Sequence, residues 1–396
     1  MGNKRHDKAP RGQRLPTDSS GATGSEREAS GLPLTFYERL AEASVDEKLA
    51  LAREAASHPG FDEEDAFEVG SRVEEALSAA GRYAEFEGLL DAWKERAPKV
   101  HDAEPAVRTW RAELALRLPG RDVKEALVSV ARLTGDAELV SRLAEWCLFR
   151  GRLDEARAGL MEAWPRVRDD ETVAEWTRVD YVTRSVLTCM DAAFRESPDL
   201  SVDQLDALLV PFAQVVPLWV REGLLLRTGR AQWLRMTGQQ VVDLSSEAFF
   251  DEQRVLVMAL EPELRARHGW PLGRTQLLFP EFFNLLPGPF GHHGRAERAM
   301  FLLLPVLSDL EHWVRGMVEE RALHPHIHAA TALALRPWGE FLVRLGLVAP
   351  EELARWWERA WQILSALPEQ FAAASDPLLV EEVRSSLQGG GSDAGR

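Results

Sequence analysis

Cysteine is scarce in this chain of 396 residues, which contains only Cys147 and Cys189. Both stand in apolar stretches with helical spacing, so a disulfide framework is excluded and a reducing compartment fits best. Neither is flanked by residues that would lower the pKa of a thiol, and the GxSxG motif of serine hydrolases does not occur. Nucleophilic catalysis therefore has no signature in this sequence.

Lysine is absent after residue 124. The six lysines are Lys4, Lys8, Lys48, Lys94, Lys99 and Lys124. Because an imine needs a lysine amine, this distribution excludes Schiff-base chemistry from residues 125–396. The lysine-dependent phosphate loop of nucleotide-binding proteins is absent too.

Long apolar runs are also lacking. The longest, ALLVPFAQVVPLWV at residues 207–220, has 14 residues and contains Pro211 and Pro217, so it is too short and too broken to span a bilayer. No apolar segment follows MGNKRHDKAPRGQR at residues 1–14, as a secretory signal would require. We therefore expect a cytoplasmic protein with no transmembrane segment.

The chain is acidic, with a formal charge of −16. Residues 1–14 carry five Lys or Arg residues against Asp7 alone, a charge of +4, which leaves −20 for the remainder. A body this acidic repels phosphate backbones, so general nucleic-acid binding is disfavoured. The basic segment could contact an anionic partner, although its Ser, Gly and Pro content favours a solvated disordered arm.

Sustained alternation of apolar and polar residues, the mark of a strand, is missing between the turn dipeptides, and helical periodicity runs from Leu34 onward. The sequence therefore predicts an all-α fold. Asp62 begins a helix with acids in its first turn, a cluster better explained by capping than by metal binding. Ser201 and Gln204 form a capping box, and Pro350 begins a helix before two acids.

A possible repeat is centred on Gly151, within FRGRLDEARAGLMEAW at residues 149–164. Small and apolar residues flank this glycine at helical spacing, namely Val140, Leu143, Ala144 and Cys147 before it and Leu153, Ala156, Leu160 and Ala163 after it. The glycine permits a tight turn, and the small residues let two antiparallel helices approach closely. This pattern predicts a helical hairpin.

A second unit stands 70 residues earlier, where Gly81 is followed at the same offsets by Tyr83, Phe86, Leu90 and Trp93, and then by Pro98. Between the two units, Trp110, Pro119, Gly120 and Ala126 indicate a third hairpin whose turn is displaced by about four residues.

Residues 66–168 thus resemble tetratricopeptide repeats, although Phe86 and Trp93 stand where that family has small residues. The resemblance implies an α-solenoid of stacked hairpins whose concave groove binds a peptide or a partner protein, without chemistry. A generic stack of helical hairpins is the alternative.

Beyond Asp170 the repeat is lost, and residues 171–196 predict one long helix, with further long helices beginning near Ser245 and Gly294. We expect a disordered tail at residues 1–33, a tetratricopeptide-like hairpin domain at 34–169, an irregular helical domain at 170–387 and a disordered tail at 388–396.

Six of the ten histidines lie between residues 292 and 328, and HPHIH places His324, His326 and His328 close together as candidate metal ligands. Residues two apart on a helix point about 200° away from each other, so His326 and His328 cannot share a face. HExxH and CxxC do not occur. A helix that begins at Pro325, with partly exposed imidazoles, is the favoured interpretation.

The loop LLPGPFGHHGRAER at residues 285–298 leads into a predicted helix near Gly294. Free backbone N–H groups there, beside His292, His293, Arg295 and Arg298, would suit a phosphate or carboxylate. The alternative, which the composition favours, is a loop whose phenylalanines Phe282, Phe283 and Phe290 pack on the core while the cations are solvated.

The helix EELARWWERAWQIL carries Trp356, Trp357 and Trp361 on one apolar face with Leu353, Ala360 and Leu364. Burial against the preceding helix is the favoured interpretation. A partner or homo-oligomer contact through the tryptophans is the alternative.

Taken together, the sequence predicts a non-enzymatic scaffold or adaptor that binds another protein or peptide and needs no cofactor. Candidate contact residues on the first helices of the hairpins are Arg72, Glu75 and Arg142. The runner-up is a helical enzyme or small-ligand binder with a His and Arg site at residues 285–328. A third possibility is a protein that self-assembles through the tryptophan helix.

Overall fold

The computed structural model describes residues 31–197, 202–212, 249–278, 282, 285–286, 303–320, 324–371 and 377–392. Every regular element in these ranges is a helix, so the all-α prediction is confirmed for the described part of the chain. None of the described helices is long and apolar enough to cross a bilayer.

The first half of the described chain contains ten helices. They are α1 (Leu34–Glu42), α2 (Val45–Ala55), α3 (Glu63–Ala79), α4 (Tyr83–Arg96), α5 (Pro98–Ala103), α6 (Pro105–Arg117), α7 (Val123–Ala131), α8 (Ala137–Phe149), α9 (Leu153–Asp169) and α10 (Glu175–Glu196).

The described segments after α10 contribute further helices. They are α11 (Val202–Leu209), η2 (Val210–Phe212), α13 (Phe249–His268), η3 (Arg274–Leu277), α16 (Leu307–Glu320), α17 (Pro325–Arg344), α18 (Pro350–Leu364), α19 (Leu367–Phe371) and α20 (Pro377–Ser392).

Asp62 caps α3 as predicted. Its side chain accepts a hydrogen bond from the Asp65 N–H at 3.0 Å, and the Asp65 carboxylate accepts one from the Asp62 N–H at 3.2 Å. Asp65 is buried and also accepts hydrogen bonds from the Leu32 N–H and the Tyr37 hydroxyl. This carboxylate therefore closes the first turn of α3 and holds the chain that leads into α1.

The contacts of Asp65 reach the end of the tail predicted at residues 1–33. The Leu32 N–H donates to Asp65, and the Gly31 N–H donates to the Gly60 carbonyl at 2.9 Å. A buried carboxylate needs hydrogen-bond donors, and the backbone just before α1 supplies one. Residues 1–30 of the predicted tail lie outside the described residues.

Three helical hairpins follow one another, α3 with α4, α6 with α7, and α8 with α9. Gly81, Gly120 and Gly151 stand at their turns with φ of +66°, +75° and +75°, a conformation that favours glycine. The eight residues predicted to pack around Gly151 are all buried, as are Tyr83, Phe86, Leu90 and Trp93. Pro98 begins the short helix α5, which interrupts the regular alternation of hairpin helices.

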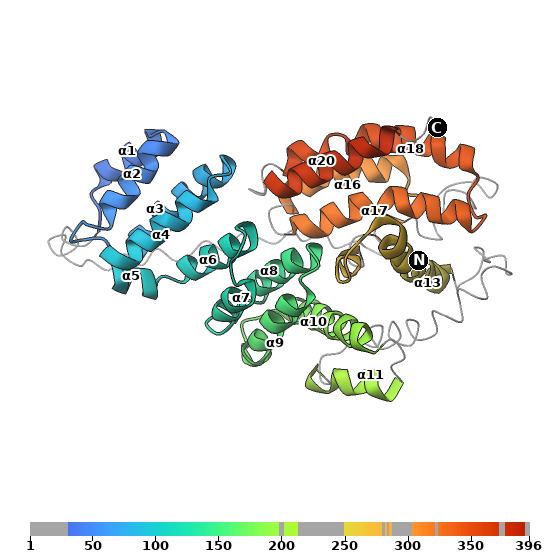
Figure 1. Ribbon diagram of the computed structural model, residues 1–396, viewed down its shortest axis with the longest axis horizontal. Helices are drawn as coiled ribbons and strands as arrows, with labels where there is room; N and C mark the ends of the chain where they lie inside the picture. The colour runs from blue at the N-terminus through green and yellow to red at the C-terminus, as the bar shows by residue number, and fades with distance from the viewer. Residues whose placement is uncertain are drawn as a thin grey trace, which may run out of the picture.

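Helix α6 belongs to two hydrophobic cores. Val107, Trp110 and Leu114 pack with α1 to α4, whereas Ala112, Ala115 and Leu116 pack with the helices that follow. This second core continues from α7 through α20. In Figure 1 the first four helices lie at one end, α16, α17, α18 and α20 lie at the other, and α6 to α9 lie between them. The boundary predicted near residue 169 falls inside the second core.

Helix α10 begins at Glu175, four residues after its predicted start. The residues just before it form a turn, in which the Asp170 carboxylate accepts a hydrogen bond from the Thr172 N–H. Pro325 and Pro350 begin α17 and α18 as predicted. The predicted helix starts near Ser245 and Gly294, and the cap at Ser201, lie outside the described residues.

The last helix reaches into the tail predicted at residues 388–396. Helix α20 continues to Ser392 through three glycines. Glycine costs about 1 kcal/mol relative to alanine within a helix, but each added residue still gains a backbone hydrogen bond once the helix is nucleated.

Candidate functional site

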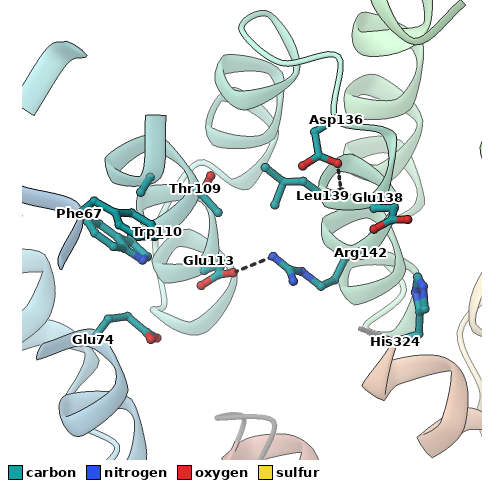
Figure 2. Close-up of a pocket in the computed structure, with 11 residues that line it drawn as sticks. Phe67, Glu74, Thr109, Trp110, Glu113, Asp136, Glu138, Leu139, Arg142 and His324 are labelled. Atoms are coloured by element: carbon teal, nitrogen blue, oxygen red, sulfur yellow. Dashed lines mark hydrogen bonds and ion pairs between the residues drawn. The ribbon is translucent and has the colours of Figure 1, made fainter. Parts of the chain in front are cut away.

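A cavity of about 400 Å³ lies between α3, α6 and α8 and is closed at one side by the start of α17 (Figure 2). We call it the α6 groove. Its lining comprises Phe67, Glu74, Ala106, Thr109, Trp110, Glu113, Asp136, Glu138, Leu139, Arg142 and His324. Because α3, α6 and α8 are the first helices of the three hairpins, the groove follows their stacking.

One side of the groove is aromatic. Trp110 is buried edge-on against Phe86, with ring centroids 5.6 Å apart, and it lies against α3 where a Cβ on Gly70 would overlap its ring. Gly70 thus permits the close approach of α3 and α6. Phe67 lies beside Trp110 in Figure 2 but is 52% exposed, which leaves an apolar surface open at the rim.

Glu74, Glu113 and Arg142 line the groove, and both carboxylates lie near the buried guanidinium of Arg117. Arg117 Nη1 lies 3.4 Å from Glu74 Oε1 and 3.8 Å from Glu113 Oε2, and Arg142 Nη2 lies 3.9 Å from Glu113 Oε1. Burial raises the pKa of Glu113; Arg117 and Arg142 oppose this shift, while Glu74 adds to it. Arg117 itself lies over the rings of Tyr83 and Trp146, at 5.0 and 4.7 Å from their centroids.

At the other side, His324 stands at the N-cap position of α17, and its side chain contacts a buried ion pair. Glu145 of α8 is 0% exposed and pairs with Arg184 of α10, and His324 Nδ1 lies 3.0 Å from Glu145 Oε1. Burial, with a further contribution from Arg184, lowers the pKa of His324 to about 4. At neutral pH the imidazole is therefore uncharged and donates its Nδ1 proton to the carboxylate. This contact ties α17 to α8 and α10.

The predicted histidine cluster does not converge on one point. His326 stacks on Trp146 with centroids 5.2 Å apart, whereas His328 meets the ring of Trp313 at 6.1 Å. These two imidazoles are 2% and 3% exposed, so the expectation of partial exposure is wrong for both. The first turns of α17 are covered by α8 and α16, which periodicity could not reveal. Within the described ranges, no group of three His, Cys, Asp or Glu side chains is placed to hold a metal ion.

The tryptophan helix α18 is largely an inward-facing element. Trp356 is buried and its Nε1–H donates to the Pro305 carbonyl at 2.8 Å, which agrees with the favoured interpretation that this face is buried. Trp357 is half-buried beneath Arg336. Trp361 is 39% exposed, and its Nε1 lies 3.3 Å from the Leu387 carbonyl to which it donates.

The remaining predicted site residues are dispersed. Arg72 pairs with Glu68 on its own helix, and Glu75 is exposed, both outside the groove lining. Arg142 does line the groove. The anion candidates His292, His293, Arg295 and Arg298 lie outside the described residues. Phe282, from the same stretch of sequence, is buried edge-on against Trp338.

Sequence reasoning missed most of the groove, although a signal was present. Ala106, Thr109, Trp110 and Glu113 form one stripe at i, i+3, i+4 and i+7 on α6. The stripe was overlooked because the displaced turn of the middle hairpin hid the register of this helix.

Comparisons with protein-family models, with curated proteins and with solved structures found no match to this chain. The tetratricopeptide resemblance thus rests on the hairpin residues alone, and it stays a prediction.

Proposed function

We propose that this protein is a non-enzymatic adaptor that binds a segment of another polypeptide in the α6 groove. The observation that carries the proposal is the combination of an exposed phenylalanine with an excess of carboxylates along three successive hairpin helices. The same arrangement agrees with the concave binding surface that the tetratricopeptide resemblance implies.

The charges favour a basic segment. Four carboxylates line the groove, from Glu74, Glu113, Asp136 and Glu138, against the guanidinium of Arg142 and that of Arg117, which contacts two of them. The groove therefore has more carboxylates than guanidinium groups, and His324 adds no positive charge because it is neutral. A lysine or arginine side chain can pack its stem on Phe67 and place its charged end among the carboxylates.

The alternative function, a ligand-binding or catalytic site at residues 285–328, contributes only His324 to the groove. Its other named residues lie outside the described ranges or are buried against aromatic rings. We therefore propose a single function.

The test is a fluorescence-polarisation titration with a labelled lysine- and arginine-rich peptide and with a version in which every cation is glutamine. We expect binding of the basic peptide only. The double variant that carries both Glu113→Gln and Glu138→Gln should bind the basic peptide about tenfold or more weakly, since two carboxylates are lost from the groove.

The affinity for the basic peptide should also fall as pH decreases. Protonation of Glu113, whose pKa is raised, removes a negative charge from the groove.

The matched control is a double variant that carries both Glu125→Gln and Glu162→Gln. It removes two carboxylates from a different surface, which is formed by α7 and α9. This control should bind like the wild type. Equal weakening by both pairs would mean that the total charge of the protein governs binding, and the α6 groove would not be the site.

A further inference from the structure

The described chain begins beside the α6 groove. Gly31 and Leu32 are held by Gly60 and by Asp65 in the first turn of α3. Phe67 and Glu74 lie further along the same helix, and the nine residues from Asp65 to Glu74 rise by about 14 Å. The attachment point of the segment that precedes Gly31 therefore lies close to the aromatic rim of the groove.

The segment that precedes it carries the complementary charge. Residues 1–14 have a net charge of +4 in a chain whose remainder is −20, and residues 15–30 connect them to Gly31. Sixteen residues can span up to roughly 50 Å when extended, well beyond the length of α3. Both the reach and the sign of the charge thus fit the groove, which has an excess of carboxylates.

We propose that residues 1–14 of this chain bind in the α6 groove of the same molecule and compete with the partner segment. This inference rests on the proposed function, because residues 1–14 would bind in the same groove as the partner segment. The proposed contact pairs the cations of this segment with the carboxylates of Glu74, Glu113 and Glu138; these cations are Lys4, Arg5, Lys8, Arg11 and Arg14.

Tethering favours this occupant over one supplied in solution. A segment joined by a short linker experiences an effective concentration of the order of millimolar, so even weak ion pairing fills the groove most of the time. A partner must then displace it, and the apparent affinity for the partner falls by the fraction of molecules whose groove is open. Raising the ionic strength weakens the internal contact and opens the groove.

The experiment uses the full chain and the labelled peptide MGNKRHDKAPRGQR in fluorescence polarisation. One variant carries five replacements in the basic segment, Lys4→Ser, Arg5→Ser, Lys8→Ser, Arg11→Ser and Arg14→Ser. We expect this variant to bind the peptide about tenfold or more tightly than the wild type, whose groove is already occupied. Adding Glu113→Gln and Glu138→Gln to it should abolish the gain.

A control variant of equal charge change carries replacements at five exposed positions elsewhere, Lys94→Ser, Lys99→Ser, Lys124→Ser, Arg355→Ser and Arg359→Ser. It should bind the peptide as weakly as the wild type does. If it gains affinity equally, net charge explains the effect and the proposal fails.

The outcomes separate this inference from the proposed function. Equal binding of the peptide by wild type and by the segment variant would overturn the internal contact and leave the proposed function standing. Failure of both proteins to bind any basic peptide would overturn the two together. Sedimentation of the wild type as a dimer that becomes monomeric in the segment variant would assign the segment to a second copy, which also overturns the proposal.

Discussion

Single polar atoms join helices that are far apart in the sequence. The Trp93 indole N–H donates to the Ala52 carbonyl at 2.9 Å, and the Trp164 N–H donates to the Pro211 carbonyl at 3.0 Å. The Tyr181 hydroxyl donates to the Leu160 carbonyl at 2.5 Å. A buried donor left without an acceptor costs about 1–3 kcal/mol, so each of these bonds selects one packing arrangement over its competitors. His324 plays the same part for α17.

His324 makes the stability of the protein sensitive to pH. Its pKa is about 4 in the folded chain and about 6.5 in an unfolded one, so between these values the unfolded chain binds more protons. Stability should therefore fall as pH decreases from about 6.5 to about 4. Urea unfolding across this window should show a smaller decrease for His324→Asn, which keeps a donor for Glu145 but cannot be protonated. Identical slopes would contradict the assignment.

At the scale of elements, α6 is the helix that joins the first hydrophobic core to the second. One of its faces belongs to the first core, another to the second core, and the stripe between them lines the groove. Its approach to α3 depends on Gly70, whose missing side chain leaves room for the Trp110 ring. The packing of the two cores and the lining of the α6 groove thus depend on the same helix.

Gly70→Ala should destabilise the protein by about 1–3 kcal/mol, because the added methyl overlaps the rigid ring of Trp110 and forces α3 and α6 apart. Gly88→Ala in α4 is the matched control. Within the described part of the chain, no atom beyond the neighbouring residues and the backbone of α4 lies within 4 Å of a Cβ placed there, so the helix should gain about 0.5–1 kcal/mol. Chemical denaturation measures both, and destabilisation of similar size in the two variants would disprove the close contact.

At the scale of the whole molecule, one arginine connects three distant segments. Arg274 in η3 donates from Nε to the Phe149 carbonyl at 2.6 Å, lies 4.1 Å from the centroid of the Phe149 ring and pairs with Glu382 at 2.8 Å. It therefore links the end of α8 to α20. The turn between α8 and α9 also packs closely against the segment before η3, since a Cβ on Gly151 would overlap the ring of Pro271.

Arg274→Met should lower the free energy of unfolding by about 1–3 kcal/mol, since it removes a largely buried charge and leaves Glu382 and the Phe149 carbonyl without their partner. Arg267→Met removes an exposed arginine that pairs with the half-buried Glu263, and it should change stability by less than about 1 kcal/mol. Thermal unfolding compares the two variants. A larger loss in Arg267→Met would refute this linking role.

Helix ends in this protein follow from residues within four positions of each other, which is why the cap at Asp62, the turns at Gly81 and Gly151 and the proline starts at 325 and 350 were predictable. The all-α character has the same local origin. Where these helices meet is a different matter. The burial of His326 and His328 and the ion pair between Glu113 and Arg142 each require helices from separate parts of the chain to pack together. Contacts between such distant segments depend on shape and burial, and a periodic pattern carries neither.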